Sequence, residues 1–243
     1  MKTINFYKVE GVRQFMPDIK DTQKQYTGMP LHEHMLLVGK TGSGKSNCLV
    51  NYIYLASQGS GSYDHIMAVV KKIEPFTKYL KKELKEKISF YLDFNKFPPV
   101  SEFPDLSTTN DKSFLIIFDD CINEKNKNHV NKILEFFTYG RSKGCTCCFL
   151  TQSFFETPDF IRKQVSWVLL CGLNGKRNLQ DIMRNYQLED MTPQQLQKMY
   201  EFAKSKQESD DELNFLKICT YECDKCKKFS RNFVGYLNPD DYV

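Results

Sequence analysis

Apolar residues in this chain gather in short continuous runs that are separated by polar or mixed stretches. Continuous runs are typical of strands buried on both faces of a parallel sheet, whereas half-exposed strands alternate apolar and polar positions. The strongest strand predictions are residues 35–38, 66–70, 114–118, 145–150 and 167–171. A shorter run at 89–92 is expected to pair near an edge of the sheet.

The stretches between these runs predict helices and loops. Residues 47–55 and 126–139 carry apolar side chains at helical spacing, and a polar helix is predicted over 75–87. Thr192-Pro193 is the start signal of another helix, because threonine caps a helix and proline suits its first position. The stretch 97–110 contains prolines, which cannot donate to a strand ladder, and is expected to be a loop.

Strands that alternate with helices predict an α/β fold, here a mainly parallel sheet with helices on both faces. With 243 residues the chain is long enough for one such domain with a substantial core. We expect a single domain over 31–243 that includes a C-terminal β-hairpin at about 213–237. The N-terminal extension, residues 1–30, is expected to pack on this core.

Composition narrows the class of protein. Hydrophobic residues make up 41% of the chain and charged residues 26%, as in an ordinary soluble globular protein. The first residues lack the apolar segment of a signal peptide, and no stretch approaches the ~18 apolar residues of a membrane span. We therefore expect an intracellular protein without a membrane partner, not a secreted one. Its nine cysteines are expected to be reduced thiols that mostly pack as small hydrophobes.

The formal net charge of +4 permits a nucleic-acid partner but does not argue for one, because a nucleic-acid site needs clustered basic residues. Lysines do cluster over 71–87, and we interpret them as the solvated face of a charged helix. A second basic group surrounds the expected hairpin tip and comprises Lys225, Lys227, Lys228 and Arg231. It could touch DNA phosphates, but a solvated turn is the favoured interpretation.

The run at 35–38 leads directly into a segment that matches the phosphate-binding pattern G-x-x-x-x-G-K-[ST]. Glycines let backbone N–H groups wrap around a phosphate, and the following helix points its positive end at the same anion. Lys45 is expected to reach the β- and γ-phosphates, and the Ser46 hydroxyl to bind Mg²⁺. A chance match is disfavoured by the strand before the motif and the helix after it. The predicted nucleotide-binding residues are Gly39, Lys40, Thr41, Gly42, Ser43, Gly44, Lys45, Ser46 and Asn47.

An acidic pair, Asp119 and Asp120, ends the apolar run at 114–118. A Mg-dependent nucleotidase needs carboxylates at the end of a strand about one strand away from its phosphate loop. Asp119 is expected to hold Mg²⁺ together with Ser46, and Asp120 to polarise the attacking water. A helix cap or surface turn is the alternative for such a pair. The next strand ends in Gln152, which could sense the γ-phosphate or orient the water, or could simply begin a loop.

Phosphoryl transfer also needs positive charge on the transition-state oxygens, often from an arginine of a neighbouring subunit. Arg141 lies in a loop before the strand that ends in Gln152, and Arg162 precedes the strand at 167–171. Arg141 is the preferred candidate for this catalytic arginine. Either residue could instead be an ordinary surface arginine.

The order of these motifs resembles the FtsK–HerA superfamily of P-loop ATPases. Within it, the sequence is most similar to the genome-packaging ATPases of virophages, giant DNA viruses and poxviruses. The segments that carry the resemblance are residues 39–46, 114–120, 140–144 and 149–153, within a likeness that spans roughly 31–236. The compact chain favours the viral branch, with a virophage packaging ATPase as the expected member.

The resemblance implies a RecA-like (ASCE) P-loop fold and a Mg-dependent ATPase that uses ATP. It further implies a homo-oligomeric ring, a pentamer or hexamer, that pumps double-stranded DNA into a preformed capsid and contacts capsid or portal-vertex proteins. Such a motor would act in the cytoplasm or virus factory of the infected cell, or associated with the virion. Two features depart from many relatives: the acidic strand ends in Asp-Asp rather than Asp-Glu, and serine rather than histidine follows Arg141.

Three cysteines near the end of the chain, Cys219, Cys223 and Cys226, have part of the spacing of a zinc knuckle. A structural zinc ion normally takes four ligands, and the four histidines are far away in sequence. An exposed hairpin tip is therefore favoured over a zinc site.

Alternatives to a packaging motor stay open at this point. A DNA helicase or another DNA-pumping ATPase would share every motif. A small-molecule kinase shares the phosphate loop but usually carries an arginine-rich lid, whereas the region after Thr192 is rich in glutamine and lysine. A nucleotide-regulated binding protein would use the same site as a switch and would not depend on hydrolysis.

Overall fold

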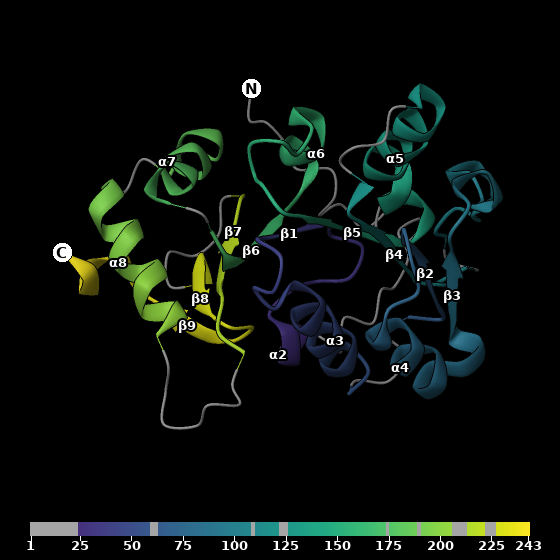
Figure 1. Cartoon of the computed structure of the whole chain (residues 1–243), viewed down its shortest axis with the longest axis horizontal. Coiled ribbons are helices and arrows are strands. Elements are labelled where there is room, and N and C mark those ends of the chain that lie inside the picture. The colour runs from purple at the N-terminus through teal and green to yellow at the C-terminus, as the bar shows by residue number, and fades with distance from the viewer. Residues whose placement is uncertain are drawn as a thin grey trace, which may run out of the picture.

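The computed structural model describes residues 24–58, 63–107, 110–121, 126–173, 175–188, 191–205, 213–221 and 227–243. These residues form a nine-stranded sheet with the strand order β3-β2-β4-β5-β1-β6-β7-β8-β9 (Figure 1). The strands are β1 (Met35–Gly39), β2 (His65–Val69), β3 (Ile88–Tyr91), β4 (Phe114–Asp119), β5 (Cys145–Thr151), β6 (Trp167–Gly172), β7 (Leu216–Cys219), β8 (Phe229–Arg231) and β9 (Gly235–Leu237).

The strands from β3 to β6 in this order all run parallel. β1 pairs with β5 on one side and with β6 on the other, and β4 pairs with β5. The strand before the phosphate-binding motif and the acidic strand are therefore separated by one strand, as predicted. Because parallel strands end at the same edge of a sheet, the segments that follow β1, β2, β4 and β5 meet there.

Helices cover both faces of the sheet. In Figure 1, α3 and α4 lie on one face, whereas α5 and α6 lie on the other. Alternate residues of a strand point to opposite faces, so Met35 and Leu37 of β1 join the core under α3, and Leu36 and Val38 join the core under α5. The helices are α2 (Lys24–Thr27), α3 (Lys45–Ala56), α4 (Pro75–Leu84), α5 (Lys127–Tyr139), α6 (Asp159–Gln164), α7 (Lys176–Asn185) and α8 (Pro193–Lys204).

The predicted α/β class is confirmed, with two additions. β7, β8 and β9 extend the sheet by antiparallel pairing, where we predicted a two-stranded hairpin. Three helices, α2, α6 and α7, were not predicted from the sequence. α6 has only six residues, and α7 carries few apolar side chains to reveal its period.

The proline-bearing stretch before β4 is a loop, as predicted, but its aromatic residues belong to the core. The rings of Phe97 and Phe103 are buried, and their centroids lie 5.2 and 5.4 Å from that of Phe136 in α5. Such aromatic pairs stabilise a core beyond the area they bury. The loop therefore anchors the β3–β4 connection on the α5 face of the sheet.

Residues 24–30 of the N-terminal extension pack on the core, and residues 1–23 lie outside the described part of the chain. Thr27 and Met29 are buried. The ammonium group of Lys217, a buried residue of β7, donates hydrogen bonds to the carbonyl oxygens of Thr27 and Phe233. Burial lowers the pKa of Lys217 to about 7. The division into an extension and one domain remains a prediction.

The described residues include some of the cysteines. Cys145, Cys147 and Cys148 of β5 are buried free thiols, and burial raises the pKa of Cys145 to about 12. Cys223 and Cys226 lie outside the described residues, so the zinc hypothesis stays untested. Within the described ranges, no three or more histidine, cysteine, aspartate or glutamate side chains come together as a metal site. In the same ranges, no helix is long and apolar enough to cross a membrane.

Candidate nucleotide-binding site

The glycine-rich segment forms the turn from β1 into α3. Gly44 has a φ of +92°, and a Cβ atom there would lie 2.8 Å from Cδ1 of Leu213. A residue with a Cβ atom would be strained in this left-handed conformation. At Gly39, a Cβ atom would lie 2.3 Å from Oγ of Ser43. Glycine at this position lets the loop fold back closely on itself.

Lys45 is the first residue of α3, and its side chain lies against the loop. The ammonium group donates hydrogen bonds to the carbonyl oxygens of Gly39 and Lys40, the latter at 3.2 Å. Burial lowers the pKa of Lys45, and the negative charge of Asp119 opposes this effect. The first N–H groups of α3, which have no acceptors within a helix, lie at the same turn. Together they form the type of anion site that binds phosphate.

Asp119 ends β4, and Asp120 follows it at the same edge of the sheet. Asp119 pairs in register with Leu150 of β5, so the acids come close to the end of that strand. Burial and the neighbouring charge of Asp120 raise the pKa of Asp119 to about 6, against the attraction of Lys45. A bound cation would relieve this repulsion between two carboxylates.

Asp120 has an unusual backbone conformation and an ion-pair partner. Its φ of +55° lies in the left-handed region, which aspartate and asparagine tolerate better than most residues. Its Oδ2 atom lies 3.1 Å from Nζ of Lys71, which follows β2. The two side chains are 37% and 54% exposed, so this pair contributes at most about 1 kcal/mol to stability. Its main consequence is to hold the carboxylate in one place.

Gln152 follows β5 directly and touches the phosphate-binding turn. Its Oε1 atom accepts a hydrogen bond from Oγ1 of Thr41 at 3.3 Å. The residue thus lies where the ends of β1, β5 and β4 converge. Its predicted role, sensing the γ-phosphate or orienting a water molecule, remains a prediction.

These groups line one cleft with about 910 Å³ of empty space. The predicted site residues in its wall are Thr41, Gly42, Lys45, Ser46, Asp119, Asp120 and Gln152. The cleft is also lined by Lys71, Lys72 and Glu74, which were not predicted as site residues. Glu74 caps α4 and lies 2.9 Å from Nζ of Lys72. The sequence did contain a signal for these three residues. They follow β2, and the end of β2 reaches the same edge of the sheet as the acidic pair.

Arg141 does not line the cleft of its own chain. It lies before β5, at the opposite end of a seven-residue strand, about 20 Å from the edge that carries the cleft. Its guanidinium group donates a hydrogen bond to Oγ of Ser166 at 2.6 Å. A catalytic role would therefore require a neighbouring subunit, as the prediction assumed. Arg162 packs its guanidinium group 5.3 Å from the ring centroid of Phe154 in its own chain.

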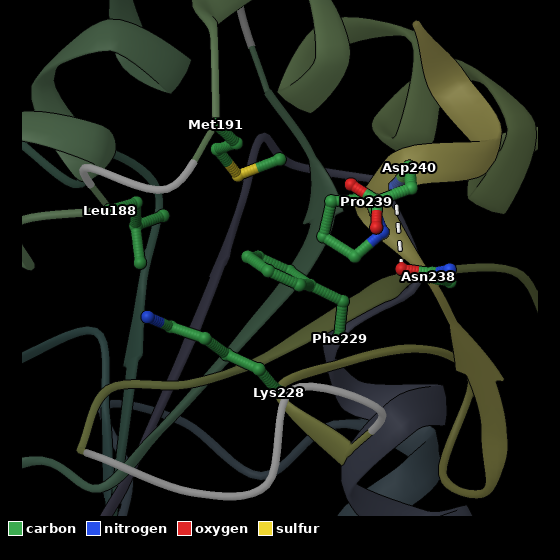
Figure 2. A pocket seen from close by; sticks show the side chains of 7 residues that line it. All are labelled: Leu188, Met191, Lys228, Phe229, Asn238, Pro239 and Asp240. Carbon is green, nitrogen blue, oxygen red and sulfur yellow. Dashed lines mark hydrogen bonds between the residues drawn. The ribbon is translucent and has the colours of Figure 1, made fainter.

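A second pocket, of about 410 Å³, lies beside the C-terminal strands (Figure 2). Leu188, Met191 and Phe229 give its wall an apolar character, and Lys228 and Asp240 lie at its sides. The strand order puts β8 three strands from β1, about 14 Å across the sheet. The pocket is therefore separate from the phosphate-binding turn, and the cleft is the candidate nucleotide site.

The basic group expected at the hairpin tip is only partly exposed. Arg231 is buried, and its guanidinium group donates hydrogen bonds to the carbonyl oxygen of Ser205 at 2.7 Å and to Oδ1 of Asn214 at 3.0 Å. Grouping Arg231 with exposed basic residues was therefore wrong, because this side chain connects β8 to the end of α8. Lys227 is exposed, and Lys225 lies outside the described residues.

The fold and the cleft define a class of protein. A phosphate-binding turn between a strand and a helix, with an acidic strand one strand away, defines a P-loop NTPase. Residues 24–225 match the family model described as Poxvirus A32 protein, and the chain belongs to this family. A comparison with curated protein sequences finds no significant match.

Solved structures share the fold. The genome packaging NTPase B204 from Sulfolobus turreted icosahedral virus 2, in complex with sulfate, aligns with 85% of this chain and 98% of its own at a TM-score of 0.55 and 16% identity. The same protein with ATP-gammaS aligns with 77% of this chain and 92% of its own, at a TM-score of 0.51 and 16% identity. EssC (ATPases 2 and 3) from Geobacillus thermodenitrificans aligns with 62% of this chain and 34% of its own, at a TM-score of 0.51 and 10% identity. The predicted FtsK–HerA-like ATPase fold is confirmed, and the virophage branch stays a prediction.

Proposed function

We propose that this chain is an ATPase that packages viral DNA by moving double-stranded DNA into a preformed capsid. The observation that carries the proposal is the single cleft in which the phosphate-binding turn, the acidic pair and Gln152 meet. Membership of the A32 family and likeness to a genome packaging NTPase support the choice of a packaging motor among ATPases.

Each group in the cleft has a task in this proposal. The N–H groups of residues 39–47 wrap the phosphates, and Lys45 exchanges its carbonyl acceptors in the loop for the β- and γ-phosphate oxygens. Asp120 accepts a proton from the attacking water, while Lys71 keeps its carboxylate oriented. Gln152 orients that water or contacts the γ-phosphate from the end of β5.

The residues in the cleft fit a bound Mg²⁺ ion. Ser46 and Asp119 both line the cleft and offer the oxygen ligands that Mg²⁺ prefers. The pKa of Asp119 is raised to about 6, partly by repulsion from the carboxylate of Asp120. A bound dication would relieve this repulsion. When bound, Mg²⁺ would neutralise charge on the phosphate oxygens.

We further propose that the chain works as a homo-oligomeric ring. Arg141 lies far from the cleft of its own chain, so a neighbouring subunit is needed for it to meet a γ-phosphate. Residues 31–243 would act as one ATPase domain that carries the extension 1–30. The ring would thread double-stranded DNA, contact capsid or portal-vertex proteins, and act inside the infected cell or with the virion.

The test is displacement of a triplex-forming strand from double-stranded DNA. A translocase should displace the third strand with ATP while the duplex stays intact, and Lys45→Ala should abolish this displacement. Separation of the duplex strands would indicate a helicase instead. Phosphate transfer to a small acceptor would indicate a kinase. Nucleotide binding without turnover would indicate a nucleotide-regulated binding protein.

A further inference from the structure

The net positive charge of the chain comes from one short segment. Residues 71–87 contain seven lysines and three glutamates, which gives +4, and the formal charge of the whole chain is also +4. The remainder of the sequence is therefore electrically balanced. A basic patch of this kind, rather than overall charge, is the footprint expected of a nucleic-acid site.

The fold turns most of this charge toward solvent. α4 buries Thr77 and Leu80 against the core. Lys78, Lys81 and Lys82 have the spacing i, i+3, i+4, which places them together on one exposed side of the helix. Lys85 and Lys87 follow in an exposed 3₁₀ turn before β3, an edge strand of the sheet. We call Lys78, Lys81, Lys82, Lys85 and Lys87 the lysine face.

Two exposed glutamates, Glu83 and Glu86, lie among the five lysines of residues 78–87, which leaves this stretch with a net charge of +3. In the described part of the chain, no ion pair within 4.0 Å involves Lys78, Lys82, Lys85 or Lys87. Like charges at i and i+4, as in Lys78 and Lys82, destabilise an isolated helix. Elsewhere the chain uses the stabilising arrangement, since Lys163 pairs with Asp159 at 2.6 Å in α6. The arrangement in α4 therefore suits an external polyanion better than it suits a solvated helix.

The segment that carries the lysine face begins at the nucleotide site. Lys71, Lys72 and Glu74, which begin the same segment, line the cleft. Lys71 also pairs with Asp120. α4 spans ten residues, about 15 Å, which covers about four base-pair steps of duplex DNA. The helix leads away from the cleft, from the end of β2 to the start of the parallel strand β3, so a polyanion held along it would extend from the cleft edge of the sheet towards the opposite edge.

We propose that the lysine face, which runs along α4 away from the nucleotide cleft, binds the phosphate backbone of double-stranded DNA. The choice of double-stranded DNA as the polyanion rests on the proposed function. The charge and geometry of the surface do not depend on it. This interpretation replaces the solvated helix face that the sequence suggested.

The test compares two triple variants of the full chain. The first is Lys78→Gln, Lys82→Gln and Lys85→Gln, and the control is Lys96→Gln, Lys112→Gln and Lys127→Gln, three other exposed lysines. Fluorescence anisotropy with a 30-base-pair duplex gives affinity across NaCl concentrations. Each lost phosphate contact should reduce the slope of log K against log salt by about 0.9, so the first variant should lose about 2.7. Its affinity at 0.1 M salt should fall on the order of 100-fold, and the control should match the wild type.

Hydrolysis of ATP without DNA is measured in parallel, and both variants should retain it. Equal affinity and slope in the wild type and the first variant would overturn the inference and leave the proposed function standing. An equal loss in the control would also overturn it, because the contact would then be diffuse. If the wild type hydrolyses ATP but binds no DNA, both the inference and the DNA part of the proposed function fail. Binding of polyglutamate in place of DNA would overturn the inference in favour of an acidic protein partner.

Discussion

Replacing Asp120 with asparagine tests the chemistry of the acidic pair with little effect on the fold. Asparagine tolerates the left-handed backbone at this position, where φ is +55°. The interaction lost is the 3.1 Å ion pair with Lys71. Both side chains are more than a third exposed, so solvent screening limits the loss to at most about 1 kcal/mol. In a domain of this size, such a loss lowers Tm by about 2–4 °C.

The effect on hydrolysis should be far larger. An amide cannot take a proton from water, and a general base typically contributes 10²–10⁴-fold to a rate. We expect kcat to fall by about that factor, equivalent to about 3–5 kcal/mol in activation free energy. Nucleotide binding should persist, because Lys45 and the phosphate-binding turn are unchanged.

Phosphate release at saturating ATP, titration of a fluorescent nucleotide and thermal unfolding measure these three effects. Asp105→Asn is the matched control, since Nζ of Lys143 lies 2.9 Å from Oδ1 of Asp105 in another ion pair, whose aspartate is 73% exposed and does not line the cleft. This control should show the small change in Tm without the loss of kcat. A kcat for Asp120→Asn within threefold of the wild type, with nucleotide still bound, would refute the assignment. Glu74 would then be the next carboxylate of the cleft to test.

Lys45→Ala and Arg141→Ala should each abolish hydrolysis. In an equal mixture of the two variants, about a quarter of the subunit interfaces should combine an intact Lys45 with an intact Arg141 from the neighbouring chain, and these should recover hydrolysis. No recovery on mixing would contradict the assignment of Arg141 as an arginine supplied by the neighbouring subunit. Gly44→Ala should lose about 1–2 kcal/mol from its backbone at φ +92° and more from the 2.8 Å contact of its Cβ atom, so its Tm should fall further than that of Gly42→Ala, which has open space. Because burial lowers the pKa of Lys217 to about 7, unfolding takes up a proton between pH 7 and about 10, and the free energy of unfolding should rise with pH by at most about 1.4 kcal/mol per unit. Denaturant titrations at pH 7 and pH 9 should show this rise in the wild type, and a Lys217→Met protein with the same rise would contradict it.

Elements whose signal is local were predictable from the sequence. β4 is a continuous apolar run, and burial on both faces of a parallel sheet makes such a run unmistakable. α7 lacked this signal, since its stability depends on packing of a few apolar residues such as Leu179 and Ile182. Arg231 was misplaced for a related reason, because an arginine can be buried when tertiary neighbours supply its acceptors.

The residues of the candidate site also fall into those with a local sequence signal and those whose position depends on tertiary neighbours. The phosphate-binding turn and the acidic pair are short motifs whose chemistry is written in adjacent residues. The pairing of Lys71 with Asp120 depends on which strands are neighbours, and β2 pairs with β4 in a register that aligns Val69 with Phe118. Sequence alone does not give strand order, so the residues that follow β2 were assigned to a solvated helix.

The central claim is that ATP hydrolysis at this cleft is coupled to double-stranded DNA in a shared, oligomeric site. The most direct measurement is the rate of ATP hydrolysis with and without duplex DNA over a range of protein concentrations. The account predicts stimulation by DNA and a rate per chain that rises with protein concentration. A rate that DNA does not change, and that stays constant per chain at every concentration, would contradict it.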